Sequence, residues 1–150
     1  MPKYFNYVFI VLIAAVLVVS FSFTYRGGEP ITIDQSEFRN ENIMINFYND
    51  SEEDSIVMQM ASVNPGYKVE VSYDDTTSST FAPGYSSFVL EDMELEMKTY
   101  RQWLRIIWLP YQTIEINLEK ETLKELPENA NMKFKSEFAE KLMEYYTKNQ

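Results

Sequence analysis

The sequence predicts an α+β protein in which one N-terminal transmembrane helix precedes an antiparallel β-sheet domain with a C-terminal α-helix. Three observations support this prediction. The run Val8–Phe23 contains no charged residue, alternating apolar and polar residues recur between positions 43 and 118, and apolar residues return at helical spacing after position 136. A β-sandwich with a helical tail is the alternative architecture.

The N-terminal run is long enough to cross a bilayer. The 22 residues Tyr4–Tyr25 carry no charge, and at about 1.5 Å per residue such a helix spans about 33 Å. Aromatic side chains flank the run at both ends, which is typical of a retained anchor at the two membrane–water interfaces. We expect the following residues to contact the membrane interfaces: Tyr4, Tyr7, Phe21, Phe23 and Tyr25.

A cleaved signal peptide is the alternative interpretation of the same run. Ser20 and Ser22 could serve as the small residues at positions −3 and −1 of a cleavage site. The chain would then be a secreted domain.

The flanking charges favour one orientation of the anchor. Lys3 and the α-amine precede the run, whereas Arg26 alone follows it before the acids begin at Glu29. The positive-inside rule then predicts a cytoplasmic N-terminus, with residues 30–150 outside the cytoplasm. The chain divides into a signal-anchor at residues 1–26, a hinge at 27–33 and an acidic extracytoplasmic α+β domain at 34–150.

Composition excludes several classes of function. The chain has no Cys and no His, which excludes disulfides, thiolate metal sites and His-dependent catalytic triads. Without Lys3 and Arg26, the remaining residues carry 11 basic and 23 acidic side chains, a net charge of −12. Such a domain is repelled by nucleic acid, so we expect no nucleic-acid partner. Because Cys and His are absent, we also expect neither a catalytic site nor a cofactor.

Alternation predicts strands in the first half of the domain. Residues 43–48 form a strand that is apolar on both faces, and residues 56–61 form a second. The turn sequence Asn64-Pro65-Gly66 leads to the strand Tyr67–Tyr73, so that residues 56–74 read as a β-hairpin. The Ser/Thr-rich segment Asp74–Tyr85 reads as a loop.

The second half is less uniform. Residues 93–97 favour a strand, with a helix from Ser87 as the alternative, and residues 100–109 fit either a strand or a helix closed by Pro110. A strand at 113–118 and a short helix at 119–126 follow. The last helix begins at the N-cap Ser136, with an apolar stripe made of Phe138, Leu142, Tyr145 and Tyr146.

One acidic segment is a weak candidate for calcium binding, because oxygen-rich loops bind Ca²⁺. It lacks the Gly that a sharply turned calcium loop often needs, so we expect a solvated turn and no metal site. The acids are Asp50, Glu52, Glu53 and Asp54. Asn49 begins an adjacent N-glycosylation sequon.

The most apolar part of the domain surrounds its two Trp residues. Trp, Tyr and Arg are enriched at interface hot spots, and the same residues could instead dock sugars, lie on the bilayer or fill the core of the sheet. The candidate partner-binding residues are Tyr100, Arg101, Trp103, Arg105 and Trp108.

These observations favour a single-pass membrane protein, anchored through Val8–Phe23, whose outer domain is a non-catalytic accessory or assembly subunit of a membrane or envelope complex. The outer domain would bind a protein partner. The alternative is a secreted module that binds carbohydrate or Ca²⁺ after signal-peptide cleavage.

Overall fold

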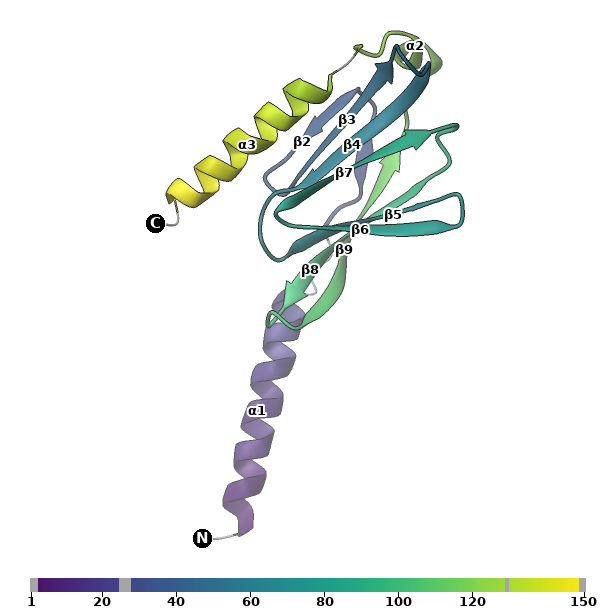
Figure 1. The fold of residues 1–150 in the computed structure, drawn as a ribbon. Coiled ribbons are helices and arrows are strands. Elements are labelled where there is room, and N and C mark those ends of the chain that lie inside the picture. Colours follow the sequence, from purple (N-terminus) through teal and green to yellow (C-terminus); the bar gives the residue numbers. More distant parts are fainter. Residues whose placement is uncertain (1–2, 25–27, 129, 149–150) are drawn as a thin grey trace.

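The computed structural model describes residues 3–24, 28–128 and 130–148. It confirms the predicted fold class: an N-terminal helix, α1 (Lys3–Thr24), is followed by two β-sheets packed face to face and by a C-terminal helix, α3 (Asn131–Lys148) (Figure 1). The domain is therefore α+β with a sandwich-like β-structure, which combines the predicted architecture with its alternative.

Sheet A has five strands in the spatial order β1-β9-β8-β5-β6. Strands β1 and β9 pair in parallel, whereas the other pairs are antiparallel. The strands are β1 (Ile31–Ile33), β5 (Tyr67–Tyr73), β6 (Thr76–Phe81), β8 (Glu96–Trp103) and β9 (Ile107–Ile116).

Sheet B has four strands in the order β2-β3-β4-β7, all antiparallel. They are β2 (Glu37–Arg39), β3 (Ile43–Asp50), β4 (Ser55–Ser62) and β7 (Gly84–Leu90). The short helix α2 (Lys120–Lys124) lies at the end of the sandwich remote from α1 (Figure 1). Its position confirms the helix predicted at 119–126.

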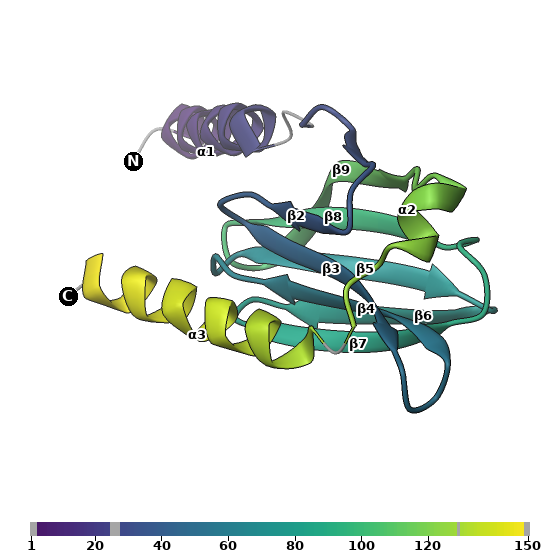
Figure 2. The same ribbon diagram turned by 90° about the horizontal axis from the view of Figure 1, so that it is seen from above.

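The main core fills the space between the two sheets. Sheet B contributes one face of β3 and β4, and sheet A contributes the inward residues of β5, β8 and β9. A second cluster lies on the opposite face of sheet B, where α3 packs (Figure 2). The prediction that residues 43–48 are apolar on both faces is confirmed, because all six are buried.

The predicted hairpin at residues 56–74 is wrong. Strand β4 pairs with β3 and β7 in sheet B, whereas β5 pairs with β6 and β8 in sheet A. The turn itself forms as expected, because Gly66 has φ +87° and the Tyr67 amide donates to the Asn64 carbonyl. It links two sheets instead of two paired strands, since both edges of β4 are occupied by other strands.

The predicted loop at Asp74–Tyr85 is also wrong. Residues 76–81 form β6 and residue 84 begins β7, which excludes the alternative helix from Ser87. The β-branched threonines of this segment favour strands. Asp74 and Asp75, both with positive φ, make the turn between β5 and β6.

The structure decides one alternative that the sequence left open and moves two predicted boundaries. Residues 100–109 form the hairpin of β8 and β9 and not a helix. Along both strands, successive side chains alternate between the two faces of sheet A. Helix α3 begins at Asn131, five residues before the predicted N-cap Ser136, since Phe134 is buried against sheet B together with Phe138. The last three residues of the predicted hinge are strand β1.

Candidate functional site

Helix α1 projects from the sandwich with its apolar side chains exposed (Figure 1). The span Lys3–Phe21 has a mean hydropathy of 2.4, and it is the one helix among the described residues that is long and apolar enough to cross a membrane. Of the predicted interface aromatics, Tyr4, Tyr7 and Phe21 are exposed on α1. The Phe23 side chain and Tyr25 lie outside the described part of the chain.

The segment after α1 is attached to sheet A. The Gly28 amide donates to the Tyr111 carbonyl at 2.9 Å, and the Gln112 side-chain amide donates to the Glu29 carbonyl at 3.0 Å. A Cβ on Gly28 would lie 2.6 Å from the Gln112 side chain, so a larger residue at position 28 would require the Gln112 side chain to move. Residues 28–33 therefore run along β9 and hold the domain close to the end of α1.

The β8–β9 hairpin touches α1 directly. The Trp103 indole packs edge-on against Phe21, with ring centroids 5.4 Å apart. Its Nε1–H also donates to the Ser20 hydroxyl oxygen at 3.1 Å. One indole thus joins the hairpin to the last turns of the apolar helix.

The turn of this hairpin is apolar and strained. Leu104 and Arg105 have φ of 51° and 56°, a conformation in which Asn and Gly are favoured and larger residues cost about 1–2 kcal/mol each. Leu104, Ile106 and Ile107 are exposed, Ile106 by 76%. Bulky apolar residues therefore occupy a turn for which soluble hairpins select small polar ones.

The five predicted partner-binding residues are divided between the two faces of this hairpin. Register places Tyr100 and Trp108 on the outer face of sheet A, which points away from sheet B. Arg101 and Trp103 lie on the opposite face, and Arg105 is in the turn. The structure therefore does not bring all five together.

The outer face of sheet A carries a cluster that the sequence did not predict as a unit. The Lys68 ammonium nitrogen lies 4.6, 5.4 and 5.6 Å from the ring centroids of Tyr100, Trp108 and Phe81. The Phe81 and Trp108 rings are themselves in contact, 5.6 Å between centroids. We call Lys68, Phe81, Tyr100 and Trp108 the Lys68 cluster.

Helices α1 and α3 pack against surfaces other than the Lys68 cluster. Helix α3 covers the outer face of sheet B, and α1 contacts the end of β8 (Figures 1 and 2). Phe81 is 52% exposed, while Lys68, Tyr100 and Trp108 are half-buried. The sequence did not indicate that Phe81 lies beside Tyr100 and Trp108, because Phe81 is in the segment that was predicted to be a loop.

Tyr100 is also linked to an acidic neighbour. Its hydroxyl donates to the Glu70 carboxylate at 3.4 Å. Burial raises the Tyr100 pKa, and the negative charge of Glu70 raises it further. The phenol therefore stays protonated, and the Tyr100 ring beside Lys68 is neutral.

A smaller aromatic group lies on the opposite face. The Arg101 guanidinium is 5.6 Å from the Tyr67 ring and 5.4 Å from the Tyr111 ring. Burial raises the Tyr67 pKa, and the Arg101 charge partly opposes that rise. Arg101 thus packs within its own sheet near the point where the chain enters from α1.

The acidic segment forms the exposed turn between β3 and β4. Asp50 caps this turn, because its carboxylate accepts from the Glu52 amide at 3.0 Å, and Asp54 has φ of 48°. Glu52 and Glu53 are exposed. Across the described residues, no three acidic side chains gather closely enough to hold a metal ion.

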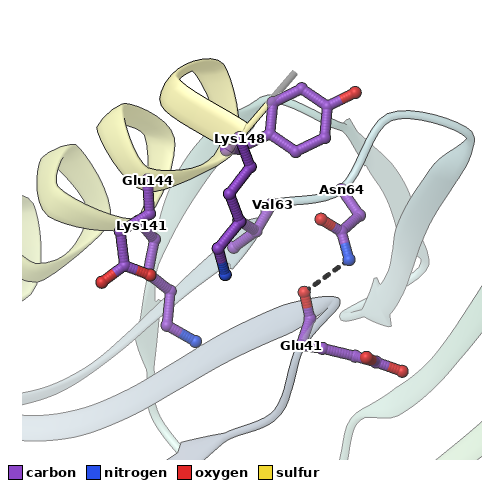
Figure 3. A pocket seen from close by; sticks show the side chains of 7 residues that line it. Glu41, Val63, Asn64, Lys141, Glu144 and Lys148 are labelled. Atoms are coloured by element: carbon purple, nitrogen blue, oxygen red, sulfur yellow. Dashed lines mark hydrogen bonds between the residues drawn. The ribbon is translucent and has the colours of Figure 1, made fainter. Parts of the chain in front are cut away.

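A pocket of about 260 Å³ lies between α3 and the loops that carry Glu41 and Asn64 (Figure 3). The Asn64 amide donates to the Glu41 carbonyl at 2.7 Å, and the Lys141 ammonium donates to the Asn40 carbonyl at 2.9 Å. Burial lowers the Lys141 pKa, and so does the nearby Arg39 charge. Lys141 therefore attaches α3 to the sandwich, and we assign a structural role to this residue of the pocket.

Comparison of the chain with protein-family models, curated protein sequences and solved structures finds no match. The function has to be inferred from the chemistry of these surfaces.

Proposed function

We propose that the protein is a single-pass membrane-anchored, non-catalytic accessory or assembly subunit. Its extracytoplasmic domain binds a partner protein of a membrane or envelope complex. The observation that carries this proposal is the Lys68 cluster, a partly exposed group of aromatic rings around a cation on the outer face of sheet A.

Retention of the anchor is supported by the contacts of Trp103. Cleavage after Ser22 would remove both Ser20 and Phe21, and with them the hydrogen bond and the ring contact that the indole makes. A partly buried indole N–H that has lost its acceptor, together with the ring that packs against it, is less stable. These contacts favour a helix that stays attached to the folded domain.

The orientation follows from charge. Lys3 precedes α1 and the acidic domain follows it, and the positive-inside rule favours the cytoplasm for the N-terminus. Residues 30–150 are then extracytoplasmic.

The Lys68 cluster fits a protein partner in its chemistry. Tryptophan and tyrosine supply large contact areas at low entropic cost and are enriched at interface hot spots. The Lys68 ammonium lies beside three rings, and a carboxylate brought to it by a partner would form an ion pair bordered by these rings. We expect the partner surface to present an apolar side chain bordered by an acidic residue.

Co-purification from native membranes tests the proposal. The full chain would carry Phe81→Ser together with Trp108→Ala, and the matched control would be Val89→Ser, which changes a residue 57% exposed on the outer face of sheet B. We expect the double variant to lose its partner while the control and the wild type retain the same one. Retention of that partner by a folded double variant would refute the assignment of the Lys68 cluster.

The intact mass of the protein from its native source tests the anchor separately. We expect a mass that includes residues 3–24. A mass that lacks them would convert the protein to a secreted domain, and the alternative, binding of carbohydrate or Ca²⁺, would then take precedence.

A further inference from the structure

We propose that the tip of the β8–β9 hairpin inserts into the interfacial layer of the bilayer that α1 spans, on the side of the folded domain. The tip consists of Leu104, Arg105, Ile106 and Ile107. The inference rests on the membrane-spanning role of α1 in the proposed function, and it adds a second point of membrane attachment.

The contacts of Trp103 set the depth of the hairpin. The indole lies against Ser20 and Phe21, and Ser20 precedes the helix end at Thr24 by four residues, about 6 Å along the axis. The base of the tip is therefore level with residues inside the apolar run. From Trp103 the chain continues away from the sandwich before it turns back, and Figure 1 shows the tip beside the last turns of α1.

The chemistry of the tip matches the boundary between headgroups and acyl chains. Three of its four residues are aliphatic and exposed, which favours burial in the outermost 5–10 Å of the apolar layer. A Trp at the base is the residue typical of this level of the membrane. Arg105 can extend its guanidinium toward lipid phosphates while its stem stays among the acyl chains.

The charge of the domain indicates which force drives insertion. With a net charge of −12 outside the anchor, the domain is repelled by anionic headgroups. Insertion therefore depends on burial of the aliphatic side chains and not on electrostatic attraction to the headgroups. We therefore expect insertion in purely zwitterionic phosphatidylcholine vesicles.

The lipid is favoured over a protein as the occupant because Trp103, at the base of the tip, contacts α1. A segment in contact with a helix at the level of Ser20 meets acyl chains wherever α1 meets them. The strained turn supports the same conclusion, since Leu104 and Arg105 keep bulky side chains at positive φ where Asn and Gly would fit.

Site-directed spin labelling of the full chain tests the inference. Because the chain has no Cys, single variants can be labelled without removing native thiols. Nitroxides would be placed at Ile106→Cys in the tip, at Thr77→Cys on the exposed outer face of sheet A, and at Ala14→Cys in the middle of α1. Collision rates with molecular oxygen and with a water-soluble nickel chelate would be measured in phosphatidylcholine vesicles.

We expect collisions of the nickel chelate with the label at 106 to be about tenfold rarer than with the label at 77, because a polar chelate is excluded from the apolar layer. Collisions with oxygen at 106 should rise, to a level between those at 77 and at 14. Equal nickel accessibility at 106 and 77, with 14 deeply buried, would overturn the inference and leave the anchor intact. A water-accessible label at 14 would overturn the anchor and the inference together.

Discussion

The outer faces of the two sheets differ in what covers them. On sheet B, residues 43–48 of β3 are buried on both sides, because the main core fills one side and α3 packs on the other. On sheet A, β5 alternates between the buried residues Val69 and Val71 and the half-buried Lys68, Glu70 and Ser72. The sequence pattern reflects this difference, since β3 carries apolar residues on both faces whereas β5 alternates between apolar and polar residues.

The contrast indicates how each face is used. Over β3 and β4, the outer face of sheet B is completed by the chain itself, through Phe134 and Phe138 packed on Met44 and Ala61. The outer face of sheet A carries an aromatic cluster that the chain leaves partly exposed. The part of the first face under α3 is therefore internal structure, and the second face is the surface that we assign to a partner.

The largest predicted effect comes from the covered face. Phe134→Ala should lower the free energy of unfolding by about 3–5 kcal/mol, because the side chain is fully buried between α3 and sheet B. Phe81→Ala, on the uncovered face, should cost less than about 1 kcal/mol. Urea unfolding of the two variants in the same detergent would measure both, and equal losses would contradict the distinction between the faces.

Arg39 should give the next largest effect, because it joins α3 to sheet B. Its guanidinium donates to the Glu137 carboxylate at 2.7 and 2.9 Å and to the carbonyls of Phe38 and Ile45. Arg39→Ala should cost about 2 kcal/mol, the range of half-buried hydrogen bonds to charged groups. Lys133→Ala is the control, since its ion pair with Glu37 is exposed, and its unfolding midpoint should change much less than that of Arg39→Ala.

Relief of turn strain should act in the opposite direction. The double change Leu104→Asn and Arg105→Gly replaces two bulky residues at positive φ by the residues that this turn favours. We expect the free energy of unfolding to rise by about 2 kcal/mol in detergent, the lower end of the cost of two strained residues. A drop in stability would mean that the tip residues contribute packing that the exposed positions do not reveal.

The smallest effect is a pH dependence at the edge of sheet B. The hydrogen bond and charge of Lys133 hold the pKa of Glu37 below its ordinary value, although partial burial opposes this. A depressed pKa stabilises the fold above the unfolded pKa of about 4.3, and the contribution is lost as pH falls through the folded value. NMR titration of the Glu37 carboxyl should show a low pKa that rises in Lys133→Ala, while an unchanged value would exclude this ion pair in solution.

The fold class could be predicted because each signal was local. The uncharged run, the strand apolar on both faces and the stripe through Phe138 and Leu142 depend only on neighbouring residues, and all three correspond to observed elements. The strand pairing could not be predicted in the same way. A turn such as Asn64-Pro65-Gly66 fixes the backbone direction, but whether β4 and β5 pair depends on which other strands occupy their edges.

The candidate site was only partly predictable for the same reason. Tyr100 and Trp108 stand out in the sequence, yet their neighbours Lys68 and Phe81 come from strands β5 and β6, which approach through sheet register. Phe81 was not identified as a site residue, because the Ser/Thr-rich segment that contains it was predicted to be a loop. The threonines of that segment favour a strand. Trp103 stood beside them in sequence but faces α1, because successive side chains on a strand alternate.

Site-specific photo-crosslinking in native membranes tests the central claim most directly. A photoreactive amino acid would replace Phe81 on the outer face of sheet A or Val89 on the outer face of sheet B, two positions of similar exposure. We predict a discrete crosslinked protein from position 81 that is lost when Trp108→Ala is added, and none from position 89. Crosslinking of a discrete protein from position 89 with none from position 81 would contradict the account.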